Sequence, residues 1–106
     1  MNAQLNNLLN EFHEKLKILY GNRLVKLVLF GSQARGDSFG DSDIDILVIL
    51  HGIVSPGKEI ARTSDLKSEL SLKYNTVISC IYISEERYLK EQSPLLLNVH
   101  RDGIPV

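Results

Sequence analysis

The sequence predicts one α/β domain, with a small mixed β-sheet and helices packed on one face of that sheet. Amphipathic helical patterns alternate with short β-branched segments along the chain, which is typical of α/β folds. The length of 106 residues allows one compact domain rather than two. No internal repeat or low-complexity stretch divides the chain, so we treat residues 1–106 as a single domain.

The composition excludes several classes of protein. Hydrophobic residues make up 43% and charged residues 24% of the chain, which argues against a disordered or fibrous protein. The net charge of -1 shows no basic excess, so we expect no direct binding to nucleic acid. The single cysteine, Cys80, cannot form an internal disulfide. No signal-peptide core occurs near the start and no aliphatic run is long enough for a membrane span, so we expect a cytoplasmic protein.

The first half of the chain predicts a helix followed by two strands. Apolar residues recur at spacings of three and four over residues 5–19, and the Gly-Asn pair at 21–22 supplies a helix stop. Residues 24–30 (LVKLVLF) and 44–50 (IDILVIL) are rich in β-branched and aliphatic side chains, which favours strands. The polar residues 33–42 between them predict a loop with at most one helical turn.

The second half predicts a helix, a third strand and two further helices. A loop over 51–57 precedes a helical pattern at 58–73, and residues 76–83 (TVISCIYI) read as a strand. Ser84 is a suitable N-cap for the next helix, which has an acidic first turn. Pro94 is well placed at the first position of the last helix, because proline lacks the N–H group that this position leaves unpaired.

Two carboxylates mark the start of the second predicted strand. Asp43 and Asp45 stand two residues apart, so they point to the same face, roughly 7 Å from each other along the chain. Carboxylates this close repel each other unless a cation lies between them, and Mg²⁺ prefers oxygen ligands. The pair therefore predicts a metal site; the alternative is a pair that is simply solvated at the edge of the sheet.

Gly31 and Ser32 follow directly after the first predicted strand. A glycine at this point allows backbone N–H groups to approach an anion closely, and the serine hydroxyl adds a hydrogen bond. Ser32 as a simple helix cap is the alternative. A phosphate-binding turn next to two metal-binding carboxylates is typical of enzymes that catalyse phosphoryl or nucleotidyl transfer.

The spacing of these residues resembles a known signature. Gly31-Ser32, ten further residues and then Asp-Ile-Asp at 43–45 is similar to the motif of the DNA polymerase β-like nucleotidyltransferase superfamily. The longer string, Gly-Ser-x-Ala-Arg-Gly followed by Ser-Asp-x-Asp, resembles its minimal (MNT) branch. The resemblance implies the polymerase β-like fold, with Gly31 and Ser32 on the nucleotide's phosphates and Asp43 and Asp45 on Mg²⁺, with Mn²⁺ as an alternative. Arg35 matches the string, and three roles stay open for it: a contact with phosphate, with a partner, or with a nearby aspartate.

The same resemblance implies an activity and a partner. Minimal nucleotidyltransferases act as antitoxins of HEPN-domain proteins, and some transfer AMP from ATP to a tyrosine of that partner. We therefore expect transfer of a nucleoside monophosphate, from ATP or another NTP, to a protein hydroxyl, and a homo-oligomer is compatible with this. A small-molecule nucleotidyltransferase of the drug-resistance type is disfavoured, because those enzymes carry an additional helical domain.

One position departs from the family pattern. Superfamily enzymes commonly carry a third carboxylate on a later strand, and in this chain Ser79 stands where we expect it. A carboxylate from Asp37, Asp41, Glu85 or the partner could replace it. Alternatively, the domain is a catalytically weak or inactive binding module that neutralises a HEPN partner sterically.

The residues that follow Asp45 predict a second surface. By strand alternation Leu47 and Ile49 share the face of the two aspartates. With helices on one face only, these aliphatic side chains would be exposed and would form a docking surface for the partner. The alternative is that the C-terminal helices cover them.

Overall fold

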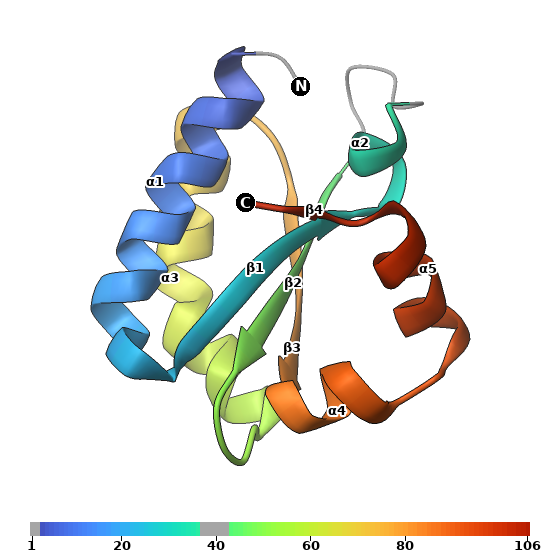
Figure 1. The fold of residues 1–106 in the computed structure, drawn as a ribbon. Helices are drawn as coiled ribbons and strands as arrows, with labels where there is room; N and C mark the ends of the chain where they lie inside the picture. Colours follow the sequence, from blue (N-terminus) through green and yellow to red (C-terminus); the bar gives the residue numbers. More distant parts are fainter. Residues whose placement is uncertain (1–2, 37–42) are drawn as a thin grey trace.

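A mixed β-sheet runs through the computed structural model, which describes residues 3–36 and 43–106 (Figure 1). The central strands β1 (Leu24–Phe30) and β2 (Ile44–Leu50) are antiparallel to each other. Strand β3 (Ile78–Ser84) is parallel to β2 and forms one edge of the sheet. The short strand β4 (Ile104–Pro105) pairs with β1 at the other edge, so the order is β3-β2-β1-β4.

Helices cover both faces of this sheet. On one face lie α1 (Ala3–Tyr20) and α3 (Pro56–Tyr74), and on the other lie α4 (Glu85–Lys90) and α5 (Pro94–Asp102) (Figure 1). The α/β class, the mixed sheet and the three predicted strand segments are confirmed. The expectation of helices on one face only is wrong, because α4 and α5 turn back over the second face.

Alternation along β2 separates the two cores. The even-numbered residues Ile44, Ile46, Val48 and Leu50 are buried against the α1–α3 layer. The odd-numbered side chains point to the opposite face, where Leu47 and Ile49 are fully buried in a cluster that includes Val28 of β1 and, from α5, Leu96 and Val99. The predicted exposed docking surface is therefore absent. The alternative, that the C-terminal helices cover these residues, is correct.

Residues at the two ends of α5 explain where this helix begins and why it stays close to the sheet. Ser93 caps the helix, because its hydroxyl accepts a hydrogen bond from the Leu96 N–H at 3.3 Å, and Pro94 occupies the first turn. After the helix, Gly103 lies so close to β1 that an added Cβ would be 2.6 Å from Cγ1 of Val28. Glycine at this position lets the chain pass from α5 into β4 and so holds the helix against the sheet.

The predicted element boundaries differ from the observed ones by a few residues. Helix α3 begins at Pro56, two residues before its predicted start. It ends at Tyr74, and the C-cap residue Asn75 that follows has a left-handed φ of 51°. Strand β3 begins at Ile78 rather than at residue 76. Ser84 ends β3 and caps α4, as predicted, with its hydroxyl accepting from the Arg87 N–H at 3.2 Å. The 3₁₀ turn η1 (Gly21–Arg23) joins α1 to β1.

A buried ionic cluster joins α1, η1 and α3. Glu59 of α3 is only 3% exposed and accepts a hydrogen bond from the Tyr20 hydroxyl at 3.0 Å. The guanidinium groups of Arg23 and Arg62 lie 3.7 Å and 3.5 Å from its carboxylate. These partners compensate the charge of Glu59, so the cluster fixes the end of the helical layer that is remote from α2. Across the described residues, no helix has the length and apolar character that crossing a membrane requires.

Candidate functional site

The predicted motif comes together at the end of the sheet where β1 leads directly into α2 (Gly31–Arg35) (Figure 1). Phe30, the last residue of β1, pairs with Asp45 near the start of β2. Gly31 is therefore the neighbour of Asp45 across the two strands. The antiparallel register of β1 and β2 thus brings together residues that are fourteen positions apart in the chain.

Gly31 makes the closest approach in this site. Its φ of +74° is left-handed, and a Cβ added to it would collide with the Oδ2 atom of Asp45. Any other residue would both strain the backbone and displace the carboxylate. The Asp45 carboxylate therefore packs directly against the first residue of α2, which places an acidic group beside the predicted phosphate-binding turn.

Asp43 and Asp45 differ in their surroundings. Asp43 is exposed, whereas Asp45 is partly buried on the face of the sheet that α5 covers. Burial raises the pKa of Asp45, the negative charge of Asp43 raises it further, and the positive charge of Arg35 opposes both effects. A cation bound between the carboxylates would relieve this repulsion.

The donor set fits a divalent cation that shares its ligands with a substrate. Asp43 and Asp45 supply two carboxylates, and Mg²⁺ commonly takes one or two from a protein and completes its shell with phosphate oxygens and water. Within residues 3–36 and 43–106 there is no group of three or more histidine, cysteine, aspartate or glutamate residues that could hold a metal. The other candidate carboxylates, Asp37 and Asp41, lie outside the described residues.

Ser32 and Arg35 both belong to α2. Phe30 occupies the N-cap position and Ser32 is the second residue of the helix, so Ser32 is not the cap. Its backbone carbonyl accepts the N–H of Gly36, whose left-handed φ of 76° ends the helix. Arg35 is exposed in the last turn of α2, and its charge acts on both Asp45 and Asp102.

Ser79 lies beside Asp45 in the parallel register of β2 and β3. Residues paired in this way point to the same face, so the serine occupies the strand position nearest to the carboxylate. Glu85, considered above as a replacement, begins α4 at the far end of β3. It lies six residues beyond Ser79, which is roughly 20 Å along an extended chain, and pairs with His51 at 3.1 Å. Glu85 therefore does not supply the third carboxylate.

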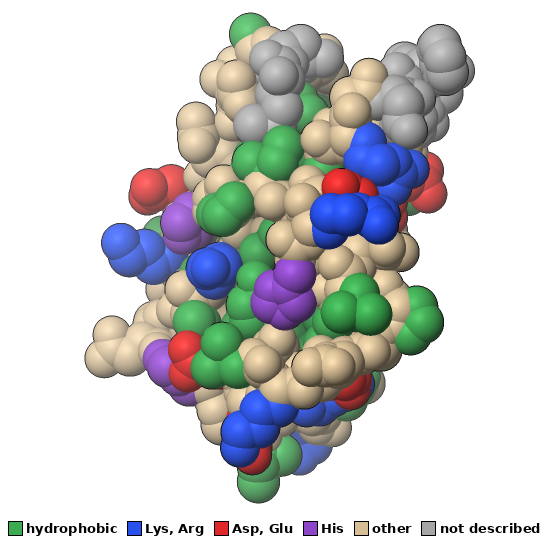
Figure 2. Space-filling view, turned by 45° about the vertical axis from the view of Figure 1, so that its right-hand side comes forward, with side chains coloured by type: hydrophobic (Ala, Val, Ile, Leu, Met, Phe, Trp, Pro, Cys, Tyr) green, Lys and Arg blue, Asp and Glu red, His purple; other side chains and the backbone are tan. Residues whose placement is uncertain are grey.

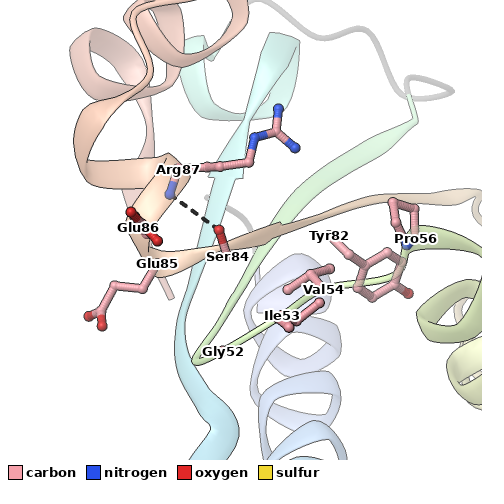
Figure 3. A pocket seen from close by; sticks show the side chains of 9 residues that line it. All are labelled: Gly52, Ile53, Val54, Pro56, Tyr82, Ser84, Glu85, Glu86 and Arg87. Carbon is pink, nitrogen blue, oxygen red and sulfur yellow. Dashed lines mark hydrogen bonds between the residues drawn. The ribbon is translucent and has the colours of Figure 1, made fainter.

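A cavity of about 500 Å³ lies away from the motif, at the opposite end of β3. Tyr82, Ile53 and Val54 form its apolar side, and Ser84 and Arg87 lie across from them (Figure 3). Its polar groups already have partners, because Ser84 caps α4 and Glu85 binds His51. A smaller cavity of about 220 Å³ adjoins Gly31. The smaller cavity adjoins the motif, so we place the candidate site at that end.

The sequence did not indicate which residues of α5 line the smaller cavity. Asn98 and Asp102 of α5 line it together with Gly31 and Arg35. They stand four residues apart on one side of an amphipathic helix, which predicts a solvated polar face. Only the path of α5 over the second face of the sheet brings them to the site.

Sequence comparisons find related proteins. The family model described as nucleotidyltransferase domain matches residues 5–98. A Methanocaldococcus jannaschii protein named "putative protein adenylyltransferase" is 43% identical over 83 residues, which are 78% of this chain and 77% of that protein.

Solved structures share the fold at low sequence identity. A Sulfolobus solfataricus chain described as a "putative nucleotidyltransferase" has a TM-score of 0.66 and 23% identity, over 96% of this chain and 80% of that one. A chain from the complex of a tri-AMPylated Shewanella oneidensis HEPN toxin with an MNT antitoxin has a TM-score of 0.59 and 20% identity, over 97% of this chain and 71% of that one. At these identities the likeness supports the fold.

Proposed function

The chain belongs to the nucleotidyltransferase domain family, and on this premise we propose that it is a Mg²⁺-dependent protein adenylyltransferase acting on a HEPN-domain partner. The observation that carries the proposal is the packing of the Asp45 carboxylate against Gly31, with Asp43 immediately before β2. This arrangement puts a backbone turn suited to phosphate next to a carboxylate pair suited to a cation. AMP as the transferred group is supported by the name of the Methanocaldococcus relative, and the HEPN partner by the Shewanella complex.

The proposed reaction is the transfer of AMP to a hydroxyl group. The hydroxyl oxygen bonds to the α-phosphorus of ATP, the bond from that phosphorus to the bridging oxygen breaks, and pyrophosphate leaves while the hydroxyl proton passes to water. Bound Mg²⁺ would neutralise the charge that develops on the phosphate oxygens. Asp43 and Asp45 would hold this ion. Gly31 and Ser32 would hold the phosphates, and Arg35 would contribute positive charge at the end of α2.

The acceptor has a clear direction of approach. On the face that carries Asp45, α5 covers β1 and β2, but Ser79 is exposed and Ile81 is 39% exposed on the edge strand β3. This part of the face lies next to the carboxylate pair because Ser79 is in register with Asp45. A partner that docks over β3 would therefore bring its hydroxyl group to the nucleotide.

The position of Ser79 favours a second candidate function. A serine hydroxyl is a poor metal ligand and a poor base at neutral pH, and no residue of β3 carries a carboxylate. A chain with two carboxylates could bind the HEPN partner and block it sterically without modifying it. The two functions predict different fates for the partner.

Intact mass spectrometry distinguishes the two. The chain is mixed with its HEPN partner, ATP and Mg²⁺, and both proteins are weighed. A transferase adds the mass of one or more AMP units to the partner, and Asp45→Asn abolishes this gain. The matched control is Asp65→Asn, which alters an exposed carboxylate on α3 and should leave the gain unchanged. A stable complex with neither protein modified would overturn the transferase and leave the steric antitoxin.

The variant Ser79→Asp tests whether the departure from the family pattern limits catalysis. It places a carboxylate beside Asp45 in the β2–β3 register. If the parent chain already transfers AMP and the variant is no faster, the third carboxylate is dispensable or comes from the partner. A gain of activity in the variant alone would identify the parent as a degenerate enzyme.

A further inference from the structure

The cavity between α2 and α5 is lined by polar groups from both helices. Gly31 and Arg35 line it from α2, and Asn98 and Asp102 line it from α5. Phe30 and Leu95 also line it and supply apolar surface. The cavity lies on the same face of the sheet as Asp45, because Phe30 pairs with Asp45 and packs against the cluster under α5.

Arg101 fixes the two polar side chains of α5. Its Nη2 donates to Oδ1 of Asn98 at 3.1 Å and to Oδ2 of Asp102 at 3.0 Å, and its Nε donates to Oδ1 of Asp102 at 3.2 Å. Because the amide oxygen of Asn98 faces the guanidinium, its Nδ2 atom keeps two N–H groups for another acceptor. Asp102 is held as an ionised carboxylate, which can only accept hydrogen bonds. The α5 side of the cavity thus offers a donor and an acceptor one helical turn apart.

Charge gives a bound nucleotide one orientation in this cavity. The face that carries α2 and α5 is turned forward in Figure 2, where basic and acidic side chains lie next to one another near the top of the molecule. Arg35 and the backbone of Gly31 favour the triphosphate on the α2 side. On the α5 side the ion pair of Arg101 with Asp102 leaves no net positive charge, so the uncharged part of the nucleotide faces Asn98 and Asp102.

We infer that this cavity binds the ribose of the nucleoside triphosphate, with Asp102 accepting a hydrogen bond from a ribose hydroxyl and Asn98 donating one to a ribose oxygen. This inference rests on the proposed function and adds ribonucleotide selectivity to it. A ribose hydroxyl both donates and accepts, so a carboxylate beside an amide N–H group is its chemical complement. The apolar surface of Phe30 and Leu95 suits the carbon skeleton of the nucleoside.

Calorimetric titration of the full chain tests the inference, with Mg²⁺ and either ATP or 2′,3′-dideoxy-ATP, which lacks both ribose hydroxyls. We expect the parent to bind ATP roughly thirtyfold more tightly than the dideoxy analogue, since a hydrogen bond to the charged Asp102 is worth about a factor of ten and the neutral one from Asn98 about a factor of three. Asp102→Ala should weaken ATP binding about tenfold and leave binding of the analogue within about twofold. Asp65→Ala, an exposed carboxylate on α3, should keep the parent's ratio.

A second variant keeps the test decisive if Asp102→Ala does not fold. Asn98→Ala should lower the preference for ATP over the analogue roughly threefold, as expected for a neutral hydrogen bond. Equal binding of the two nucleotides by the parent, or an unchanged ratio in these variants, would overturn the ribose site while nucleotide binding itself stands. A parent that binds neither nucleotide would overturn the proposed function and this inference together.

Discussion

At the scale of single residues, the site depends on one glycine and one carboxylate that touch. Gly31 is left-handed and has no room for a side chain, because Asp45 occupies the space that a Cβ would need. Gly36 is also left-handed, with a φ of +76°, but has nothing within 4 Å of its Cβ position. Backbone strain and steric exclusion can therefore be separated by comparing the two glycines.

Gly31→Ala should impair both stability and nucleotide binding. Forcing alanine into the left-handed region costs about 1–2 kcal/mol at either glycine, and at Gly31 the displaced carboxylate adds to this cost. Urea denaturation should therefore show a greater loss for Gly31→Ala than for Gly36→Ala. Gly57→Ala, in α3 with open space and no positive φ, should lose nothing. Equal losses at Gly31 and Gly36 would show that the contact with Asp45 has no consequence.

In the absence of metal and nucleotide, the ionised Asp45 carboxylate should lower the free energy of unfolding. Burial and the charge of Asp43 raise its pKa, so its ionised form is disfavoured by folding. Its contribution to the free energy of unfolding should become less unfavourable as the pH falls through this raised pKa, because protonation removes the charge that burial disfavours. At pH 7 the metal-free Asp45→Asn variant should be at least as stable as the parent. Thermal unfolding checks this, with Asp65→Asn as the control, and a clear loss of stability in Asp45→Asn would contradict it.

At the scale of elements, local patterns account for most of the predicted fold. The apolar stripe of α1 and the aliphatic runs of β1 and β2 repeat with the period of their own element, so their sequences were sufficient to assign them. Strand β4 has only two residues and includes Pro105, so its sequence shows no alternation that could predict a strand. Its pairing with β1 depends on where α5 ends. For the same reason the burial of Leu47 and Ile49 could not be read from β2 alone.

Two adjacent leucines of α5 should contribute very differently to the stability of the fold. Leu96 is fully buried against the second face, whereas Leu97 is 54% exposed. Leu96→Ala should lower the free energy of unfolding by about 2–5 kcal/mol, and Leu97→Ala by no more than about 0.5 kcal/mol. Urea denaturation measures both changes in the same helix. Similar small effects at both positions would show that α5 is not an integral cover of the sheet.

At the scale of the whole molecule, the candidate site contains two sets of residues, and only one of them could be predicted from the sequence. Gly31, Ser32, Asp43 and Asp45 belong to a contiguous motif, and the spacing of that motif is enough to indicate their chemistry. Asn98 and Asp102 reach the cavity beside Gly31 only because the chain folds α5 back over β1 and β2. The sequence contains no local signal for this juxtaposition, since a polar helix face is ordinarily solvated. The candidate nucleotide site is thus built from two distant parts of the chain, across one face of the sheet.

Nucleotide binding across these parts should stabilise the whole fold, and only in the presence of metal. A ligand that binds the folded state alone raises the free energy of unfolding by about 2.7 kcal/mol at a concentration of one hundred times its dissociation constant. For a domain of this size that corresponds to a rise in melting temperature of roughly 10–20 °C. We expect this rise with ATP and Mg²⁺ together, and its loss when EDTA removes the metal, because Asp43 and Asp45 bind the phosphates only through a cation. The double variant Asp43→Asn, Asp45→Asn should show little or no rise, whereas Asp65→Asn should show the full one. An equal rise in the double variant would place the nucleotide away from the carboxylate pair.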